Sequence, residues 1–295
     1  MKALISILSF LPLKILYFLG DVFTYPLMYY VIRYRRKVVR KNLRLSFPDK
    51  SDKERKDIER RFYHHLTDLF AEVIWSYRAT EAQMLEHFES VNVDKVEQWA
   101  QQKGGVIFML GHLGNWEWTA EVQHRFTNPE MRHYNVYRRL NSPSADQAMT
   151  AIREQRSGVG SNIEKNNLLR QLVALKKQNA KFTLGLIADQ KPSPRNQHYW
   201  TTFLNQDTSF LDGGEVLAKK FDYVVTYVYM TCPKRGHYVA RVDLITDDAK
   251  NTAPNEITEQ FARRLEENIL AQPEQWLWSH NRWKFPRSQS ATTAS

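Results

Sequence analysis

The sequence is poor in cysteine and glycine, with one Cys and 11 Gly in 295 residues. A lone Cys232 excludes an intramolecular disulfide and a cysteine metal cluster. Three catalytic patterns are also missing: the HExxH zinc motif, the GxSxG nucleophile elbow, and a complete GxGxxG or P-loop. We therefore expect no metal site. The sequence does not support a zinc hydrolase, a serine hydrolase or a nucleotide enzyme that uses these motifs.

No long uninterrupted apolar run occurs either. Residues 3–32 are largely apolar, but Lys14 and Asp21 divide them. Neither half reaches the ~20 residues that span a bilayer alone. Together they form an expected membrane anchor over residues 1–32, which either spans the bilayer or lies in its surface as a bent hairpin. The residues that follow, Tyr29 to Arg33, make a poor signal-peptide cleavage site, so we disfavour cleavage.

Negative charge is in deficit, with 32 Asp and Glu against 42 Lys and Arg, a net charge of +10. Cations gather in a juxtamembrane segment, residues 33–45: Arg33, Arg35, Arg36, Lys37, Arg40, Lys41 and Arg44. Such a run suits nucleic acid or anionic lipid, where each cation contributes roughly 1 kcal/mol. The adjoining apolar stretch favours an anionic membrane over nucleic acid. By the positive-inside rule, the rest of the chain then faces the cytoplasm.

The remainder alternates helical and strand patterns. Ser51 and Glu54 have capping-box spacing before a helical apolar stripe. Helices are also expected at 164–178 and 256–270, and strands at 106–110, 182–187, 224–230 and 238–244. This order predicts an α/β fold: a mixed, largely parallel sheet flanked by helices, preceded by the apolar membrane-anchor helix. We expect one domain over residues 46–287 and a disordered tail, 288–295.

The sharpest local pattern is the turn from Gly111 to Glu117, where a buried strand ends and a helix is expected to begin. His112 is a candidate general base, and Glu117 a carboxylate that orients its imidazole. In one regular helix the two side chains would point ~140° apart. They can meet only if His112 lies in the turn that Gly111 and Gly114 allow. The alternative is a buried histidine whose ring bonds to backbone.

These residues resemble the late acyltransferases of lipid A biosynthesis, whose superfamily includes the bacterial phosphatidylinositol mannoside acyltransferases, and more distantly the glycerolipid acyltransferases. The shared element is His112, four residues, then Glu117. The resemblance covers nearly the whole chain in the expected order. It includes the apolar start with its basic run, VYRR at 136–139, NNL at 166–168, ADQ at 188–190, GGEVLA at 213–218 and PEQWLWSHNRWK at 273–284.

The resemblance implies an O-acyltransferase without a covalent acyl-enzyme. His112 would take the proton of a lipid hydroxyl as that oxygen attacks a thioester, and Glu117 would support the histidine. Residues implied to bind the oxyanion or substrate are Asn115, Arg138, Arg153, Arg156 and Asp189, with Asp189 shaping the site. For each of Arg138, Arg153 and Arg156 the alternative is an ordinary solvated charge or a phosphate contact. Arg282 and Lys284 either hold a phosphate or belong to an aromatic tail that packs on the domain.

The implied partners are an acyl carrier protein, a phosphorylated glycolipid acceptor and an anionic membrane. The donor is an acyl-carrier-protein thioester or acyl-CoA, with no further cofactor. The implied location is the inner membrane, with the catalytic domain in the cytoplasm. Two alternatives stay open: an acyltransferase for a glycerolipid, aminolipid or mannosylated lipid, and a non-catalytic protein that binds anionic membrane.

Overall fold

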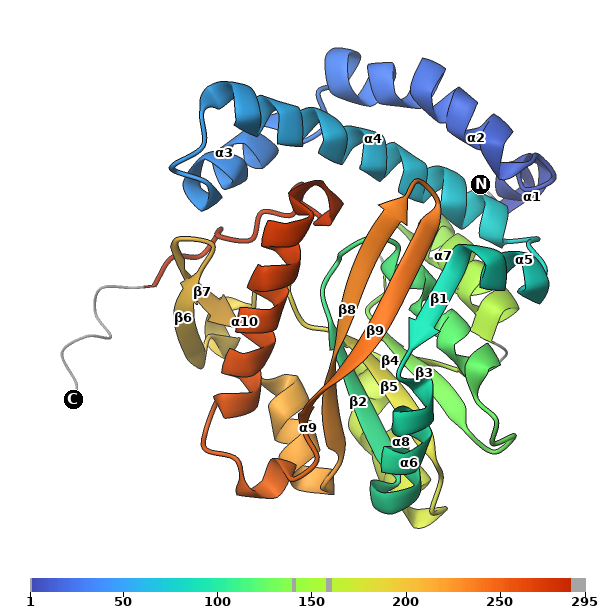
Figure 1. Cartoon of the computed structure of the whole chain (residues 1–295), viewed down its shortest axis with the longest axis vertical. Coiled ribbons are helices and arrows are strands. Elements are labelled where there is room, and N and C mark those ends of the chain that lie inside the picture. Colours follow the sequence, from blue (N-terminus) through green and yellow to red (C-terminus); the bar gives the residue numbers. More distant parts are fainter. Residues whose placement is uncertain (1, 140–141, 158–160, 288–295) are drawn as a thin grey trace.

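The computed structural model of the chain describes residues 2–139, 142–157 and 161–287, so the predicted tail lies outside the described residues. Its centre is one seven-stranded sheet in the order β1-β9-β8-β2-β5-β3-β4 (Figure 1). All neighbours are parallel except the antiparallel pair β8 and β9. The strands are β1 Phe88–Val91, β2 Gly105–Leu110, β3 Arg132–Tyr137, β4 Asn162–Glu164, β5 Phe182–Ile187, β8 Val224–Lys234 and β9 His237–Thr246. A separate hairpin pairs β6 Tyr199–Phe203 with β7 Gln206–Phe210.

Helices pack around this sheet, so the predicted α/β class is confirmed. They are α5 Glu81–His87, α6 Val93–Lys103, α7 Pro143–Ser157, α8 Leu168–Lys177, α9 Gly213–Phe221 and α10 Glu256–Ala271. The expected helix at 164–178 forms only from Leu168, because residues 162–164 add an edge strand and 165–167 form a 3-10 turn. The helix expected after Asn115 is a 3-10 helix, Trp116–Arg125.

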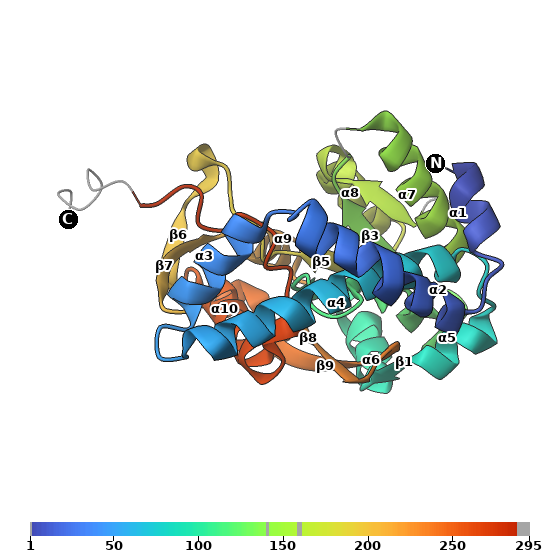
Figure 2. The ribbon, with the colours of Figure 1, turned by 90° about the horizontal axis from the view of Figure 1, so that it is seen from above.

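Helix α4, Asp52–Ser76, crosses the end of the sheet at which β8 ends (Figures 1 and 2). It begins at the predicted capping box, in which Ser51 Oγ accepts the Glu54 N–H and Glu54 accepts the Ser51 N–H. Such a cap satisfies two orphan N–H groups of the first turn. The predicted apolar stripe is buried at Ile58, Phe62 and Leu66, whereas Phe70 is half exposed.

The N-terminal residues form short helices along the outer side of α4: α1 Lys2–Leu8, α2 Leu13–Leu19 and two π-helical turns, Gly20–Thr24 and Leu27–Val31 (Figure 2). The expected single anchor helix is not confirmed. Among the described residues no single helix has the length and apolar composition of a membrane span; only the pair Leu13–Val31 and Arg36–Ser46 does so together, and it is bent by 81°. The bend lies between Val31 and Arg36, where Arg33 and Arg35 have φ of +54° and +49° and so end the helix.

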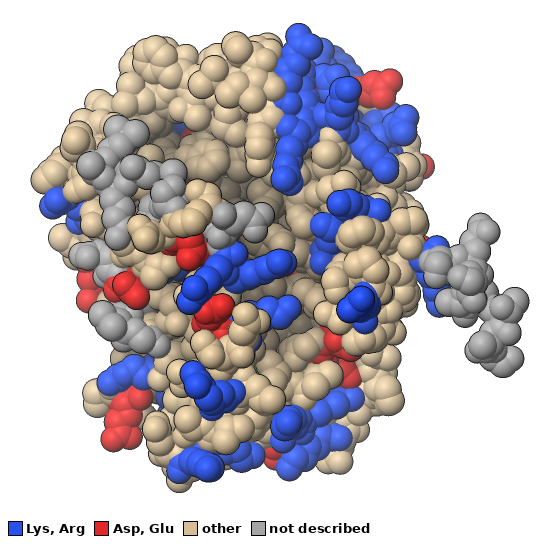
Figure 3. Space-filling model, turned by 180° about the vertical axis from the view of Figure 1, so that it is seen from behind, with Lys and Arg blue, Asp and Glu red and all other residues tan. Residues whose placement is uncertain are grey.

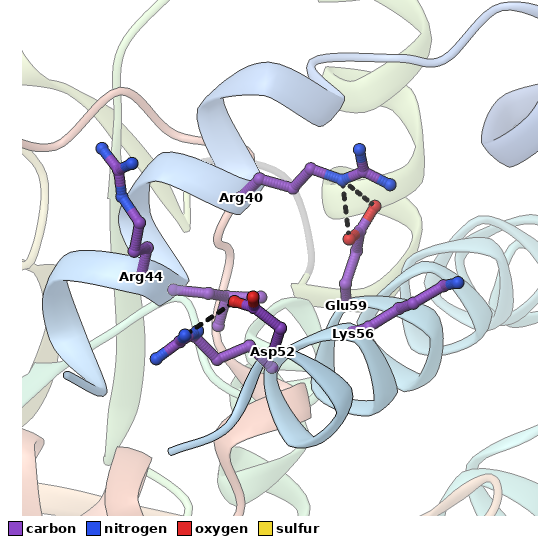
Figure 4. Close-up of a pocket in the computed structure, with 7 residues that line it drawn as sticks. Arg40, Arg44, Asp52, Lys56 and Glu59 are labelled. Atoms are coloured by element: carbon purple, nitrogen blue, oxygen red, sulfur yellow. Dashed lines mark hydrogen bonds and ion pairs between the residues drawn. The ribbon is translucent and has the colours of Figure 1, made fainter. Parts of the chain in front are cut away.

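The basic segment is folded onto the domain. Its residues form α3, Arg36–Ser46, whose Arg36 and Arg40 both pair with the buried carboxylate of Glu59 on α4. Figure 4 shows the pocket of about 330 Å³ between the two helices, with Arg44 and Lys56 also on its wall. The segment predicted as a separate juxtamembrane stretch therefore shares an ion-pair network with α4.

The register of the sheet decides which loops meet. Leu110 at the end of β2 lies beside Ile187 at the end of β5, in parallel. The two residues that follow each strand therefore leave the sheet together at the same edge. In doubly wound α/β proteins, this carboxyl edge is where ligands bind.

Candidate active site

The turn after β2 is held from behind by the aromatic C-terminal segment. Gly114 donates its N–H to the Gln275 carbonyl, and Leu277 donates to the His112 carbonyl. Gly114 has φ +53°, which favours glycine, and a Cβ there would lie 2.8 Å from Met230 Cγ. The glycine therefore lets the backbone reverse against β8 and present the His112 side chain at the sheet edge.

Asp189 holds His112 through both of its oxygens. Oδ1 lies 2.6 Å from Nδ1 of the imidazole, and Oδ2 accepts the backbone N–H of the same residue at 2.8 Å. The Asp189 side chain is buried, while that of His112 keeps 15% of its surface exposed. A carboxylate on Nδ1 keeps the proton on that nitrogen and leaves Nε2 as the basic atom.

Three interactions keep Asp189 ionised in its buried place. Burial raises the pKa of the Asp189 carboxyl, but His112, its backbone N–H and the indole N–H of Trp276 together lower it to about 2. The Trp276 Nε1 to Asp189 Oδ2 distance is 2.8 Å. A carboxylate fixed by hydrogen bonds from three directions can stabilise positive charge on the imidazole without moving.

The free side of the imidazole faces polar and aromatic groups. Gln190 places its amide nitrogen 3.2 Å from His112 Nε2, which fits an N–H donated to an unprotonated ring nitrogen. The Trp116 ring meets the imidazole edge-on, with centroids 4.9 Å apart. A substrate hydroxyl that replaces the Gln190 amide would find a base already oriented toward it.

Glu117 does not make the expected hydrogen bond to His112. It lies in the first turn of the 3-10 helix and binds Arg153 of α7 through two bonds, Nε to Oε2 at 2.9 Å and Nη2 to Oε1 at 2.7 Å. Burial raises the pKa of Glu117, but the charge and bonds of Arg153, with the nearby His112, hold it below the ordinary value. The interaction of Glu117 with the imidazole in this structure is therefore between charges, without a hydrogen bond.

The Asn115 amide binds a second buried carboxylate, that of Glu72. Its side chain is 1% exposed and donates Nδ2 to Glu72 Oε2 at 2.7 Å. Tyr17 of α2 donates to Oε1 of the same group at 2.6 Å, and Tyr238 also binds it. Burial raises the pKa of Glu72 to about 7, against the opposing effect of those three donors. Glu72 therefore ties the N-terminal helices to the active-site turn through Tyr17 and Asn115.

The other predicted residues lie around this centre. Arg138 follows β3 and is exposed, and the Arg156 side chain lies outside the described part of the structure. Arg282 is buried, as the alternative of an aromatic tail packed on the domain predicts, and its pKa is lowered by burial to about 10. The described residues contain no cluster of three metal-ligating side chains.

Comparison with known proteins shows the family of the chain. A family model described as bacterial lipid A biosynthesis acyltransferase matches residues 1–285. The chain belongs to this family. Over 279 residues it is 25% identical to a lipid A biosynthesis palmitoleoyltransferase of Escherichia coli K12 and to a lipid A biosynthesis acyltransferase of Shigella flexneri, covering 93% of this chain and 86% of each relative. A lauroyltransferase of E. coli K12 is 23% identical over 280 residues, covering 93% and 87%.

Sequence reasoning underrated two residues of this acyltransferase. Asp189 was assigned to shaping the site rather than to the imidazole, although His112 and Asp189 each lie two residues beyond paired strand ends. Counting outward from two adjacent parallel strands would have found this pair. Glu72 was not singled out at all, because a glutamate inside an amphipathic helix pattern looks like a solvated charge.

Proposed function

We propose that this acyltransferase moves a fatty acyl chain from an acyl-carrier-protein thioester, or from acyl-CoA, to a hydroxyl of a lipid A precursor. One observation carries the proposal: a partly exposed imidazole whose Nδ1 is bonded to a buried, ionised Asp189 at 2.6 Å. This arrangement suits proton abstraction from a weak acid such as a hydroxyl, because the charge that forms on the ring is stabilised in place.

In the proposed reaction, Nε2 of His112 takes the hydroxyl proton while the oxygen attacks the thioester carbonyl. The tetrahedral oxyanion then collapses, an ester bond forms and the carbon–sulfur bond breaks. The leaving thiolate takes the proton from the imidazolium, so the products are ester and thiol and the enzyme returns unchanged. Asp189 stays ionised throughout, since its pKa of about 2 lies far below neutral pH.

Arg153 is the proposed donor to the oxyanion. Glu117 binds Nε and Nη2 of its guanidinium, so Nη1 lies outside that bidentate pair. A guanidinium held by a bidentate carboxylate is fixed in orientation before substrate arrives, which is what oxyanion stabilisation requires. In this proposal Glu117 supports catalysis by positioning Arg153 and by its charge near His112.

The N-terminal helices are the proposed membrane contact. Most exposed large apolar side chains of the described chain lie between Ile7 and Tyr34, among them Phe10, Phe18 and Phe23. The basic helix α3 follows directly. An apolar face beside cations is typical of helices that lie in an anionic membrane surface. We accordingly propose attachment to the inner membrane, with the active site on the cytoplasmic side near an acyl carrier protein.

The test compares the full chain with His112→Ala and Asp189→Ala in detergent micelles, supplied with labelled acyl-carrier-protein thioester and a tetra-acylated lipid A precursor. We expect transfer by the wild type and losses of at least about 100-fold in both variants. The matched control is His237→Ala, a histidine on β9 outside the site. Absence of transfer by the wild type from both carrier-protein and CoA thioesters would refute the assignment of acceptor.

A further inference from the structure

A cluster of cations lies beside the His112–Asp189 pair and is not used in the proposed chemistry. Its members come from four separate segments: Arg35, Arg138, Lys191, Arg282 and Lys284. Burial lowers the pKa of the Lys191 ammonium, and so does the charge of each of the other four. Each of the other four is therefore near enough to Lys191 for the two charges to repel, although the members are up to 249 residues apart in sequence, from Arg35 to Lys284.

Direct contacts join three of these four segments. Lys191 is two residues past Asp189, and its backbone N–H lies 3.4 Å from Nε2 of His280. The ammonium groups of Lys191 and Lys284 lie 5.4 and 5.3 Å from the centroid of the same ring, that of Phe285. Arg35 donates Nη1 to the Ser279 carbonyl at 3.2 Å. The cluster is thus built around the C-terminal segment that also supports the His112 turn.

No carboxylate of the described chain forms an ion pair with any of the five cations. Arg282 is the clearest case, because its side chain is 3% exposed and its Nε has no hydrogen-bond partner. It donates only to the Ser209 carbonyl and lies over the Phe210 ring. Asp189 is the nearest compensating charge and is already bonded to His112 and Trp276. A buried, unpaired guanidinium is costly unless an anion completes the site.

The molecular surface agrees with a binding place for an anion. Figure 3 shows a recess in the face opposite to that of Figure 1, with Lys and Arg side chains along its edge. A band of cations at the upper right follows the position of α3 after the half-turn from Figure 1. A phosphate that enters such a recess meets several donors at once, which favours a doubly charged anion.

We propose that Arg35, Arg138, Lys191, Arg282 and Lys284 form a phosphate-binding subsite that places one substrate next to His112. The inference rests on the proposed function, since it assigns a substrate group to the same active site. Two substrates carry phosphate: the glucosamine-lipid acceptor, as a phosphomonoester, and the donor, as the phosphodiester of its phosphopantetheine arm.

The experiment measures equilibrium binding to the full chain in detergent, without turnover. The acceptor probes are a tetra-acylated, bis-phosphorylated glucosamine disaccharide and the same lipid after phosphatase treatment. The donor probes are an acyl-phosphopantetheine thioester and the acyl-pantetheine thioester that lacks the phosphate. Each probe is titrated into the wild type and into the double variant Lys191→Gln/Lys284→Gln. The control is a second double variant with the same charge change, Lys95→Gln/Lys177→Gln. Both control lysines are exposed, on α6 and α8.

If the acceptor phosphate occupies the subsite, the Lys191/Lys284 variant binds the phosphorylated lipid about 10- to 100-fold more weakly, as expected for losing charge-assisted hydrogen bonds. Phosphatase-treated lipid binds wild type and variant equally. If the donor phosphate occupies it, the loss appears only with acyl-phosphopantetheine, whose phosphomonoester stands in for the phosphodiester of the carrier protein, and the subsite then binds the donor. The proposal is overturned if wild type binds phosphate-bearing and phosphate-free probes alike, or if the control variant loses as much.

Failure of the subsite differs from failure of the proposed function. Phosphate-dependent binding without acyl transfer would support the subsite and contradict the proposed reaction. Acyl transfer with phosphate-independent binding would support the reaction and contradict the subsite. The single variant Lys284→Gln, at an exposed position, gives a second reading should the double variant unfold.

Discussion

Asp189 binds His112 twice, with one carboxylate oxygen on the imidazole Nδ1 and the other on the backbone N–H. The side chain therefore fixes both the ring tautomer and the position of the turn that carries it. Because Trp276 also donates to Oδ2, the carboxylate cannot rotate without losing two bonds. Catalysis and local stability should consequently depend on the same group, and the variants below separate the two.

Replacing Asp189 by Asn should lower kcat by about 100- to 10,000-fold, because an amide N–H facing Nδ1 favours the tautomer with a protonated Nε2. Steady-state acyl transfer and thermal unfolding are measured together, so that a folded but slow enzyme is recognised. Trp276→Phe is the control: it removes one bond to the carboxylate but keeps its charge, and should cost only several-fold. A rate near that of wild type for Asp189→Asn would contradict the assigned tautomer.

Glu117 and Arg153 should behave as one unit. Glu117→Gln and Arg153→Gln should each lower kcat/KM by about 100-fold, the order found for an oxyanion donor, and the double variant should lose little more than the worse single one. The measurement is a double-mutant cycle on acyl transfer. Losses that multiply would instead mean that Glu117 acts on His112 independently of Arg153.

Gly114→Ala should destabilise the protein by about 2–4 kcal/mol, from the positive φ and from overpacking against Met230. Gly213→Ala is the matched control, because a Cβ there meets nothing within 4 Å. It should leave stability within about 1 kcal/mol of wild type. Urea unfolding of the two variants compares them directly, and equal midpoints would show that the Gly114 turn is relaxed.

Glu72 should make stability fall as pH rises. Its folded pKa of about 7 lies above that of an unfolded carboxyl, so the folded state binds the proton more tightly. The resulting stability is fully present below about pH 4.5 and is lost as pH rises to about 7, a change of roughly 3 kcal/mol. Glu72→Gln should flatten unfolding free energy against pH in this window, whereas Glu89→Gln, at an exposed carboxyl, should not. An unchanged slope in Glu72→Gln would assign the effect elsewhere.

The exposed aromatic face of the N-terminal helices should govern membrane binding. Phe18 and Phe23 are 61% and 64% exposed, so Phe18→Ser with Phe23→Ser should leave thermal stability unchanged. Partition onto anionic vesicles should drop by about tenfold or more for each residue, because each buries apolar area in the lipid. Vesicle flotation measures the binding of this double variant. The control is a second double variant, Leu169→Ser/Val173→Ser, on α8. Equal losses in both pairs would mean that this face has no special part in binding.

Much of the fold was readable because its signals are local. Ser51 and Glu54 cap α4 as their spacing predicts, and the apolar runs at 106–110 and 182–187 form β2 and β5. The anchor helix was the main error, since composition over residues 3–32 does not show where a helix bends. Pro12 separates α1 from the helix Leu13–Val31, and Arg33 and Arg35, both with positive φ, separate that helix from α3.

By itself, the sequence determined that a histidine would lie in a glycine-flanked turn at the end of a buried strand, because strand and turn propensities act over a few residues. The tertiary structure decided which carboxylate meets it. Glu117, five residues away, turns to Arg153, whereas Asp189, 77 residues away, reaches the imidazole because β2 and β5 pair in parallel. Strand pairing is a non-local choice, settled when the whole sheet buries its apolar faces, so no short pattern contains it.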